Sequence, residues 1–221
     1  MSDQDHVHRL RRLDCCAISD ALDKLCLSGQ VTSLPRRAGQ GRIAGRAVTV
    51  KLGTGAPPPG PPRHLGTTAI EAANSESIIV VEQITGVEAG CWGGLLTLGA
   101  KVQGVQGVVA DGPVRDIDEA RDLNFPIFTN RTTSLTARSR VVEMGTNVPV
   151  TICGVSVAAG DFVVADDSAV IFIKPDDIDR VISTAEAIVA REAAMARAIL
   201  AGTPMHEVMG GNYENMLKAD A

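Results

Sequence analysis

The chain has 221 residues, of which 45% are hydrophobic and 21% are charged. This length and balance are typical of a globular protein with one sizeable core and argue against intrinsic disorder. Aromatic residues make up only 3%, and the net charge is −5 with a pI of about 5.4. Both values argue against a nucleic-acid binder, which needs a basic face or aromatic platforms for stacking.

The sequence contains no predicted membrane segment, secretion signal or disulfide framework. No apolar run reaches the roughly 18 residues that span a bilayer, and the first 13 residues are charged rather than apolar. No CxxC pair exists among the five cysteines, which argues against a cysteine-built zinc site. We therefore expect reduced thiols in a cytoplasmic protein without a membrane partner.

The N-terminal segment is predicted to be helical. Apolar residues recur at helical spacing from Leu10 to Leu25, and Ser19 or Asp20 can cap a second turn of structure. The preceding residues, which include the histidines His6 and His8, are expected to be frayed.

Strands and helices alternate through the middle of the chain, which predicts an α/β fold. Apolar and β-branched runs predict strands at 46–52, 77–82, 107–110 and 126–128. Helical patterns predict helices at 64–74, 95–102 and 116–123, the last with Asn124 just after its C-terminus. The proline-rich stretch 53–62 predicts a surface loop.

The C-terminal third predicts a β-meander followed by a long helix. Three strand-like runs follow one another without helices, at 148–157, 162–165 and 169–173. A proline followed by acidic residues opens a helix that runs from Pro175 to Ala201. We predict a single domain over 1–202, then a short helix and tail over 203–221 that is loosely ordered or docks on a neighbouring subunit.

The glycine pair Gly93-Gly94 precedes a predicted helix. Free backbone N–H groups at a helix start receive anions, and glycine lets a small carboxylate approach the backbone closely. The alternative is an ordinary strand-to-helix turn without a ligand, and the glycine pair by itself does not decide between the two.

A second candidate lies at the end of the strand 107–110, where a turn projects Arg115 and Asp116 together. Ligand sites in α/β proteins lie at such strand ends. Asp116 could bind a hard divalent cation, and Arg115 could bind a substrate carboxylate or stabilise an enolate. The alternative is that Asp116 caps the next helix and Arg115 pairs with it, and the spacing favours this at least as strongly.

Other ionisable residues are weaker candidates. Glu119 lies on the same helical face as Asp116, so the two can share a metal or water shell, whereas Asp118 has the pattern of a surface charge. His64 follows the proline-rich loop and is either a substrate contact or, more commonly for such a position, a surface residue. Lys51 and Lys101 are the candidates for a Schiff base, and neither has a supporting motif.

The segments Trp92-Gly93-Gly94-Leu95-Leu96, 104–116 and 125–128 resemble the RraA-like family over about residues 15–185. That family includes the regulator of ribonuclease E activity and aldolases for 4-hydroxy-4-methyl-2-oxoglutarate and 4-carboxy-4-hydroxy-2-oxoadipate. Its aldolase signature is a glycine, twenty residues, Arg-Asp, two residues and an acid, which Gly94, Arg115, Asp116 and Glu119 match.

The resemblance implies a class II pyruvate aldolase that requires Mg²⁺ or Mn²⁺. Asp116 would carry the cation largely through waters, with Glu119 in support, and the backbone amides of Gly94, Leu95 and Leu96 would hold the substrate carboxylate. Arg115 would orient a catalytic water and stabilise developing charge. Cleavage of a 4-hydroxy-2-oxo acid such as 4-hydroxy-4-methyl-2-oxoglutarate and decarboxylation of oxaloacetate share a pyruvate enolate, so the second activity is expected beside the first.

The resemblance also implies a layered α/β/β/α swivelling-domain fold with a mixed sheet, assembled as a homotrimer or homohexamer. A further acid from a neighbour's C-terminal segment is then expected, with Glu207 and Glu214 as candidates. Many aldolases of this family carry an acid directly after the first glycine of the pair, Gly93, where this chain has Gly94. That departure leaves decarboxylation, or another 2-oxo or hydroxy acid substrate, open beside aldol cleavage.

Two other functions compete with the lyase. The first is a non-catalytic regulator of ribonuclease E type that binds and masks a protein surface, and Glu119 favours the lyase over it because this acid completes the metal signature. The second is a methyltransferase, which the sequence disfavours because no glycine-rich loop with an acidic strand end is present.

Overall fold

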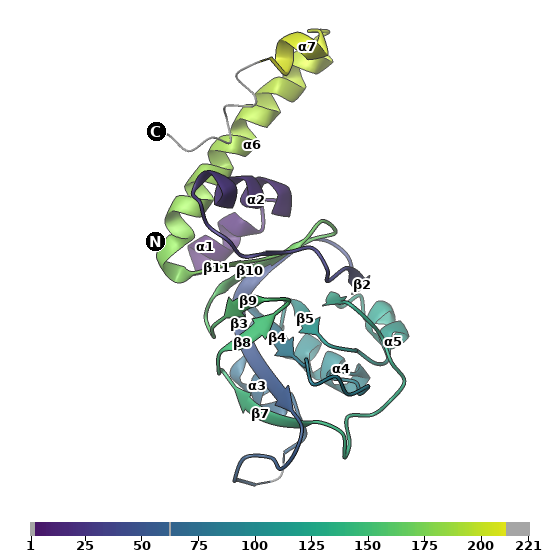
Figure 1. The fold of residues 1–221 in the computed structure, drawn as a ribbon. Coiled ribbons are helices and arrows are strands. Elements are labelled where there is room, and N and C mark those ends of the chain that lie inside the picture. The colour runs from purple at the N-terminus through teal and green to yellow at the C-terminus, as the bar shows by residue number, and fades with distance from the viewer. Residues whose placement is uncertain (1–2, 62, 211–221) are drawn as a thin grey trace.

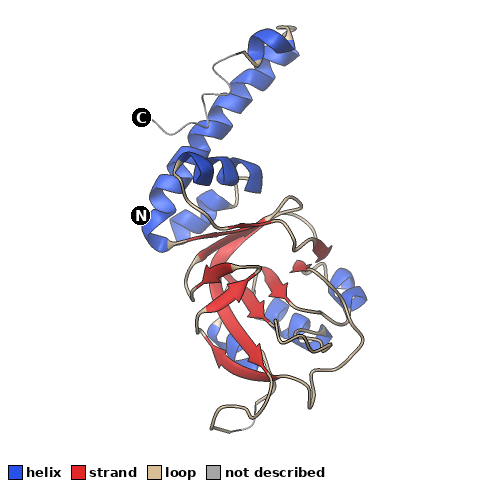
Figure 2. Ribbon diagram, in the orientation of Figure 1, coloured by secondary structure: helices blue, strands red, loops and turns tan. Residues whose placement is uncertain are grey.

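The computed structural model describes residues 3–61 and 63–210 and shows a mixed α/β protein (Figure 1). The described residues form a nine-stranded mixed sheet and a separate two-stranded sheet. Helices pack against the curled sheet at one end and along one side (Figure 2). The α/β fold class predicted from the sequence is confirmed.

The helices are α1 (Asp3–Leu10), α2 (Cys15–Lys24), α3 (Thr67–Ala72), α4 (Gly94–Val102), α5 (Ile117–Asp122), α6 (Ile178–Leu200) and α7 (Met205–Val208), with a 3-10 turn at Pro175–Asp177 before α6. The strands are β1 (Gln30–Val31), β2 (Arg36–Ala38), β3 (Ile43–Gly53), β4 (Ser77–Glu82), β5 (Gly107–Asp111), β6 (Ile127–Thr129), β7 (Val142–Thr146), β8 (Val150–Ile152), β9 (Val155–Val157), β10 (Phe162–Ala165) and β11 (Val170–Ile173).

Four parallel strands form the centre of the large sheet. Its order is β1-β11-β10-β3-β4-β5-β6-β2, with β7 also paired to β3. Neighbours from β3 to β6 run parallel, whereas β10 and β11 are antiparallel. Strands β4 and β5 are buried at every position, as expected for strands covered on both faces. The carboxyl ends of the parallel strands consequently share one edge, where the loops of the candidate site begin.

The N-terminal prediction of one helix from Leu10 to Leu25 was wrong, because the chain turns between α1 and α2. The side chain of Asp14, rather than Ser19 or Asp20, caps α2 and accepts a 2.8 Å hydrogen bond from the Ala17 N–H. Apolar spacing continues through this turn because Leu13 is buried within it, and periodicity alone does not reveal the break.

The expectation of a frayed N-terminus was also wrong. The ring of His6 is buried, and its Nε2 lies 2.9 Å from the Asp179 Oδ1 on α6. The ring of His6 also meets the edge of the Phe162 ring at a centroid distance of 5.6 Å. This contact joins α1 to α6 and the sheet, and a sequence separation of 173 residues hides it from local patterns.

The expected run at 148–157 consists of two short strands. The strands β8 and β9 form their own hairpin, which turns at Cys153 and Gly154 with φ of 47° and 89°. Strand β7 was not predicted because its residues are mostly half-exposed and it is defined by its pairing with β3. The long C-terminal helix is confirmed, whereas the division of the chain at residue 202 stays a prediction.

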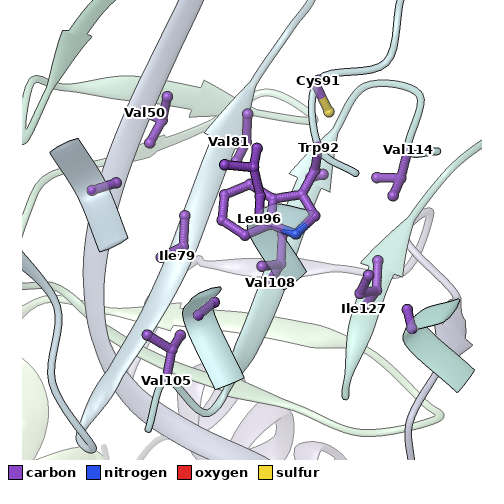
Figure 3. Close-up of a cluster of buried hydrophobic side chains, with 14 of the residues drawn as sticks. Val50, Ile79, Val81, Cys91, Trp92, Leu96, Val105, Val108, Val114 and Ile127 are labelled. Atoms are coloured by element: carbon purple, nitrogen blue, oxygen red, sulfur yellow. The ribbon is translucent and has the colours of Figure 1, made fainter. Parts of the chain in front are cut away.

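Separate apolar clusters cover different parts of the sheet. One lies beneath α3, α4 and α5 and contains the buried Trp92 (Figure 3). Another joins α1, α2 and α6 to β10 and β11, and a third fills the inside of the curl. No helix in the described ranges is long and apolar enough to cross a bilayer.

Candidate active site

Three loops meet at the carboxyl edge of the parallel strands. They follow β4, β5 and β6, and isolated parallel bridges join Trp92 to Val114 and Val114 to Thr132. The three loops therefore lie in the same order as the strands that they follow. This brings the turn before α4 and the turn before α5 side by side, although about twenty residues separate them in the sequence.

Trp92 and Thr97 fix the start of α4. The Nε1 of the fully buried Trp92 donates a 3.0 Å hydrogen bond to the Thr97 Oγ1, and that hydroxyl donates to the Gly93 carbonyl at 3.0 Å. The indole lies among Leu96, Val81 and Val108 in the core (Figure 3). The first backbone N–H groups of the helix are thereby held at the surface of the site, where they lack intrahelical acceptors.

Asp116 adopts a strained backbone conformation and binds the neighbouring helix. Its φ of 57° and ψ of 41° lie in the left-handed region, which non-glycine residues rarely adopt and which Asp and Asn tolerate better than most. It occupies the N-cap position of α5 but makes no capping hydrogen bond. Its Oδ2 instead accepts the Gly94 N–H at 2.9 Å. The alternative in which Asp116 caps its own helix is therefore wrong, and its carboxylate faces the start of α4.

Arg115 lies beside Asp116 with spare hydrogen-bonding capacity. Its backbone N–H donates to the Trp92 carbonyl at 2.9 Å, and its aliphatic stem lies against the Gly90 backbone. The Nη2 is 3.8 Å from the Asp116 Oδ1, which is an ion pair but too long for a hydrogen bond. Its buried Nε finds no hydrogen-bond partner among the described residues. A buried guanidinium nitrogen without a partner favours a ligand anion at this position.

Glu119 takes the space that a side chain at position 94 would need. A Cβ built on Gly94 would overlap the Glu119 carboxylate and would lie 3.3 Å from the Asp116 Cβ. Two carboxylates therefore gather at the start of α4, where the helix dipole and free N–H groups favour negative charge. Position 94 therefore lacks the acid that many aldolases carry there, and the Glu119 carboxylate from α5 occupies the same place.

Two cavities flank the pair Arg115 and Asp116. One has a volume of about 260 Å³ and also exposes the turn 93–96 and His64. The other, about 580 Å³, adjoins Glu119 and the residues 132–134. The Arg-Asp pair forms the wall between them, so both groups are reachable from either side.

The carboxylates at this site are ligands that fit a hard, partly hydrated divalent cation. The described residues contain no cluster of three or more His, Cys, Asp or Glu side chains that could enclose a metal. The described residues therefore do not supply the ligands of a closed structural zinc site. Asp116 and Glu119 supply carboxylate oxygens at an exposed place, and Mg²⁺ is commonly held by one or two carboxylates plus waters and substrate.

The two lysines proposed for a Schiff base carry structural contacts. Lys51 Nζ lies 3.3 Å from the buried Glu82 Oε1, and Lys101 Nζ donates to the Leu123 carbonyl. His64 lines the smaller cavity, and its Nδ1 lies 2.9 Å from the Leu65 carbonyl. The structure therefore brings His64 to the site and ties both lysines to other elements.

The remaining candidates lie away from this edge. Asp118 pairs with Arg121 at 2.8 Å on the exposed face of α5. Glu207 and His206 belong to α7, at the far end of α6 (Figure 1). Glu214 lies outside the described residues, so contribution of either acid to a neighbour's site stays a prediction.

Cys91 lies next to the site but has the properties of an inert core thiol. Complete burial raises its pKa to about 12, with a smaller contribution from the negative charge of Asp111. At neutral pH the thiol is protonated, and only the thiolate is a strong nucleophile. Cys91 therefore serves packing in this arrangement rather than covalent chemistry.

Sequence reasoning missed the segment that closes the smaller cavity on its outer side. Thr136 and Ala137, in the loop between β6 and β7, line this cavity opposite the start of α4. They carry no motif, and the nearest segment with a sequence signal, 125–128, was predicted as a strand rather than as part of the site. Only the pairing of β7 with β3 places their loop over the site.

The chain belongs to the RraA-like family. A family model described as "Aldolase/RraA" matches residues 15–172, which is more than half of the chain. The matched region contains both glycine-rich turns, the Arg-Asp pair and Glu119. The resemblance inferred from the sequence motifs is therefore confirmed.

Relatives within this family have different names. A protein of Halalkalibacterium halodurans named "Putative 4-hydroxy-4-methyl-2-oxoglutarate aldolase" is 31% identical over 198 residues, covering 88% of this chain and 89% of that protein. The crystal structure of an uncharacterized protein from Pseudomonas syringae pv. tomato is 26% identical with a TM-score of 0.82, covering 94% of this chain and 98% of the other. Streptomyces coelicolor RraAS2, described as an unusual member of the RNase ES inhibitor RraA family, has a TM-score of 0.74 at 24% identity, covering 87% and 96%.

Proposed function

We propose that this protein is a divalent-metal-dependent lyase that cleaves a 4-hydroxy-2-oxo acid to pyruvate and decarboxylates oxaloacetate. The observation that carries the proposal is the unpartnered, buried Nε of Arg115 beside the Asp116 carboxylate, in one cavity with the start of α4. A cation, a carboxylate and free backbone amides at one place match the charges of a 2-oxo acid. The relative named as an aldolase supports this class of substrate.

The substrate carboxylate is bound at the start of α4. The Gly94 N–H already donates to Asp116, so the amides of Leu95 and Leu96 are the ones left to receive it. The helix dipole favours the same charge. Arg115 donates from its side chain to the keto oxygen and so fixes the orientation of the substrate in the smaller cavity.

Cleavage breaks the bond between C3 and C4. A water oriented by Arg115 removes the proton from the C4 hydroxyl, C4 becomes a carbonyl, and the electron pair of the bond moves to the pyruvyl fragment as an enolate. Protonation at C3 then releases pyruvate. In oxaloacetate the departing group is carbon dioxide, and the same enolate forms. The guanidinium stabilises the negative charge that develops on the former keto oxygen.

Asp116 and Glu119 would hold Mg²⁺ or Mn²⁺, which when bound supplies Lewis-acid stabilisation of that negative charge. The left-handed backbone of Asp116 directs its carboxylate toward the start of α4, where this stabilisation is needed. Strain held at one residue beside a cavity is a recurrent feature of functional sites.

The test is pyruvate release from oxaloacetate and from 4-hydroxy-4-methyl-2-oxoglutarate, with Mg²⁺ and with EDTA. We expect turnover that EDTA abolishes and Mg²⁺ or Mn²⁺ restores. Replacement of Asp116 by Asn keeps a side chain that tolerates the left-handed conformation, removes the charge, and should lower kcat/KM by about 10³-fold. Asp118→Asn, on the exposed face of α5, is the control. Turnover that survives both EDTA and Asp116→Asn would refute the metal-dependent lyase.

A second candidate is a non-catalytic regulator that binds a ribonuclease; the Streptomyces relative is named as a member of an RNase ES inhibitor family. One observation favours it: Leu95, Leu98 and Val102 form an apolar stripe on α4 and are 87%, 46% and 80% exposed. Large exposed apolar side chains on one helix face are typical of protein contacts. Inhibition of a ribonuclease that is lost on Leu98→Asp but kept on Asp116→Asn would favour this candidate.

A further inference from the structure

His64 lines the smaller cavity, and the proposed function gives it no role. It shares this cavity of about 260 Å³ with the start of α4 and with Arg115. The other three histidines lie elsewhere, since His6 and His8 belong to α1 and His206 belongs to α7. His64 is therefore the histidine that a small ligand bound beside Arg115 meets.

Hydrogen bonds hold the turn that carries His64. The His64 carbonyl accepts a 2.7 Å hydrogen bond from the Thr67 hydroxyl at the start of α3. The Gly66 N–H donates to the Glu143 Oε2 on β7 at 2.7 Å. Gly66 has a φ of 79°, and a Cβ there would lie 3.2 Å from the Trp92 ring. The turn is thus tied to α3, to β7 and to the core beneath α4, which fixes the attachment of His64 at the cavity.

The hydrogen bond of the His64 ring decides which of its nitrogens can accept a proton. The Nδ1 lies 2.9 Å from the Leu65 carbonyl oxygen. A carbonyl oxygen only accepts, so Nδ1 carries the hydrogen in this bond and the neutral ring has its lone pair on Nε2. No described residue forms a hydrogen bond with Nε2. An imidazole in this arrangement can act as a general base through Nε2.

Charged groups surround the turn of His64 on several elements. They are Arg63, Glu71, Glu143, Arg115, Asp116 and Arg138. Arg63 pairs with Glu71 at 2.7 Å, and Arg115 lies 3.8 Å from Asp116, so these four form two pairs of opposite charge. Both oxygens of Glu143 accept hydrogen bonds, and Arg138 lines a neighbouring cavity that His64 also borders. Histidine is the side chain in this set that accepts and releases a proton near neutral pH.

The two reactions of the proposed function differ in their need for a base. In a 4-hydroxy-2-oxo acid, the C4 hydroxyl loses its proton as the bond between C3 and C4 breaks. In oxaloacetate, C4 belongs to an ionised carboxylate, and carbon dioxide leaves without removal of a proton. The water that Arg115 orients is a weak base, so it must pass a proton on during cleavage. A base beside this water is therefore required for cleavage and not for decarboxylation.

We propose that His64 is a catalytic residue whose Nε2 takes up this proton. The inference rests on the proposed function, which supplies the substrate and the water in the smaller cavity. As the bond between C3 and C4 breaks, the hydroxyl proton moves to the water, and a proton of that water moves to Nε2. The water is regenerated and the imidazole becomes an imidazolium. The imidazolium then donates its proton to C3 of the enolate, which releases pyruvate and restores the neutral ring.

Pyruvate release from 4-hydroxy-4-methyl-2-oxoglutarate and from oxaloacetate, both with Mg²⁺, tests the proposal. His64→Gln keeps a side chain of similar size without a base, so kcat for cleavage should fall about 100-fold while KM and the decarboxylation rate stay unchanged. In the unaltered chain, cleavage should decline toward acid pH more steeply than decarboxylation, and this difference should disappear in His64→Gln. Added imidazole should restore cleavage in His64→Ala. His8→Gln, at an exposed histidine on α1, is the matched control and should leave both reactions unaltered.

Equal losses in both reactions would overturn the inference, because His64 would then act in binding or in a step that the reactions share. Unaltered cleavage by His64→Gln would overturn it too, and turnover that EDTA abolishes would then leave the proposed function standing. Decarboxylation without any cleavage by the unaltered chain would refute the role of His64 and the aldol half of the proposed function. Absence of pyruvate release from both substrates would refute the proposed function and the role of His64 with it.

Discussion

Carboxylates and cations have different surroundings in the helical layer and at the edge of the sheet. In the helical layer, Glu186 accepts two hydrogen bonds from Arg9, at 2.8 and 2.6 Å. Asp166, which anchors the start of α2, accepts the Cys15 N–H at 2.9 Å and the Ser168 N–H at 2.8 Å. At the edge of the sheet, Asp116 accepts the Gly94 N–H at 2.9 Å, but the Arg115 guanidinium approaches Asp116 only to 3.8 Å.

The difference distinguishes groups that stabilise the fold from groups available to a ligand. Burial alone would raise the pKa of the Asp166 carboxyl, but the N–H donors of Cys15 and Ser168 outweigh it and hold the pKa below its usual value. Arg115 keeps a buried Nε without a partner in the described chain. A buried charged group whose hydrogen bonds are all made adds to the stability of the fold. A buried charged group that lacks a hydrogen-bond partner lowers stability until a ligand binds to it.

After the Asp116→Asn substitution, the largest expected effect is on Arg115, whose buried Nε has no partner in the described chain. Arg115→Lys keeps the charge but loses the planar fork of donors, so kcat/KM for pyruvate release should fall about 100-fold. The melting temperature should stay unchanged, because the lost donor has no partner within the described protein. Arg121→Lys on α5 is the control, since Arg121 pairs with Asp118 at the surface. An unaltered kcat/KM in Arg115→Lys would exclude contact with the substrate.

The next effect is expected at Asp166, whose carboxylate already accepts hydrogen bonds from the Cys15 and Ser168 N–H groups. Asp166→Asn should lower the free energy of unfolding by about 2 kcal/mol at neutral pH, since charge-assisted hydrogen bonds to backbone N–H groups are lost. Because the folded-state pKa is lowered, this stability is present above the unfolded-state pKa and is lost as pH falls through the folded-state pKa.

Urea unfolding of the Asp166 variant between neutral and acidic pH measures both parts of this prediction. The variant should show a shallower loss of stability with acid than the unaltered chain. Asp122→Asn is the control because Asp122 is exposed at the end of α5, whereas Asp167 would be unsuitable since it pairs at 3.0 Å with the largely buried Arg36. A variant with the same acid dependence as the unaltered chain would mean that Asp166 does not act through its charge.

The smallest effect is expected at Gly94. A methyl group there must displace the Glu119 carboxylate, whose flexible end can move, so kcat/KM should fall about tenfold with little change in stability. Gly99→Ala on the same helix is the matched control, because its Cβ would make only an ordinary contact at 3.6 Å with Ile70. If the loss acts through Glu119, Gly94→Ala should add little in a Glu119→Ala background. Additive losses would show that Gly94 acts independently.

Much of the fold was predictable where a strand or helix carries its own signal. β4, β5 and α4 matched their predictions because β-branched runs and a glycine-flanked helix are local features. The break before Asp14 and the hairpin β8–β9 were not predicted, because pairing and burial elsewhere decide them. The motif residues of the site were found from the sequence, but its outer wall at Thr136 was not.

By itself, the sequence determined the α/β class through local periodicity and the family through its motifs. The resemblance to that family also predicted Gly94, Arg115, Asp116 and Glu119 as site residues. The tertiary structure decided what these residues contact. Only the convergence of three loops at one sheet edge shows that Asp116 binds the Gly94 N–H instead of capping its own helix. Contacts between distant segments depend on how the strands pair, and local sequence patterns carry no record of that pairing.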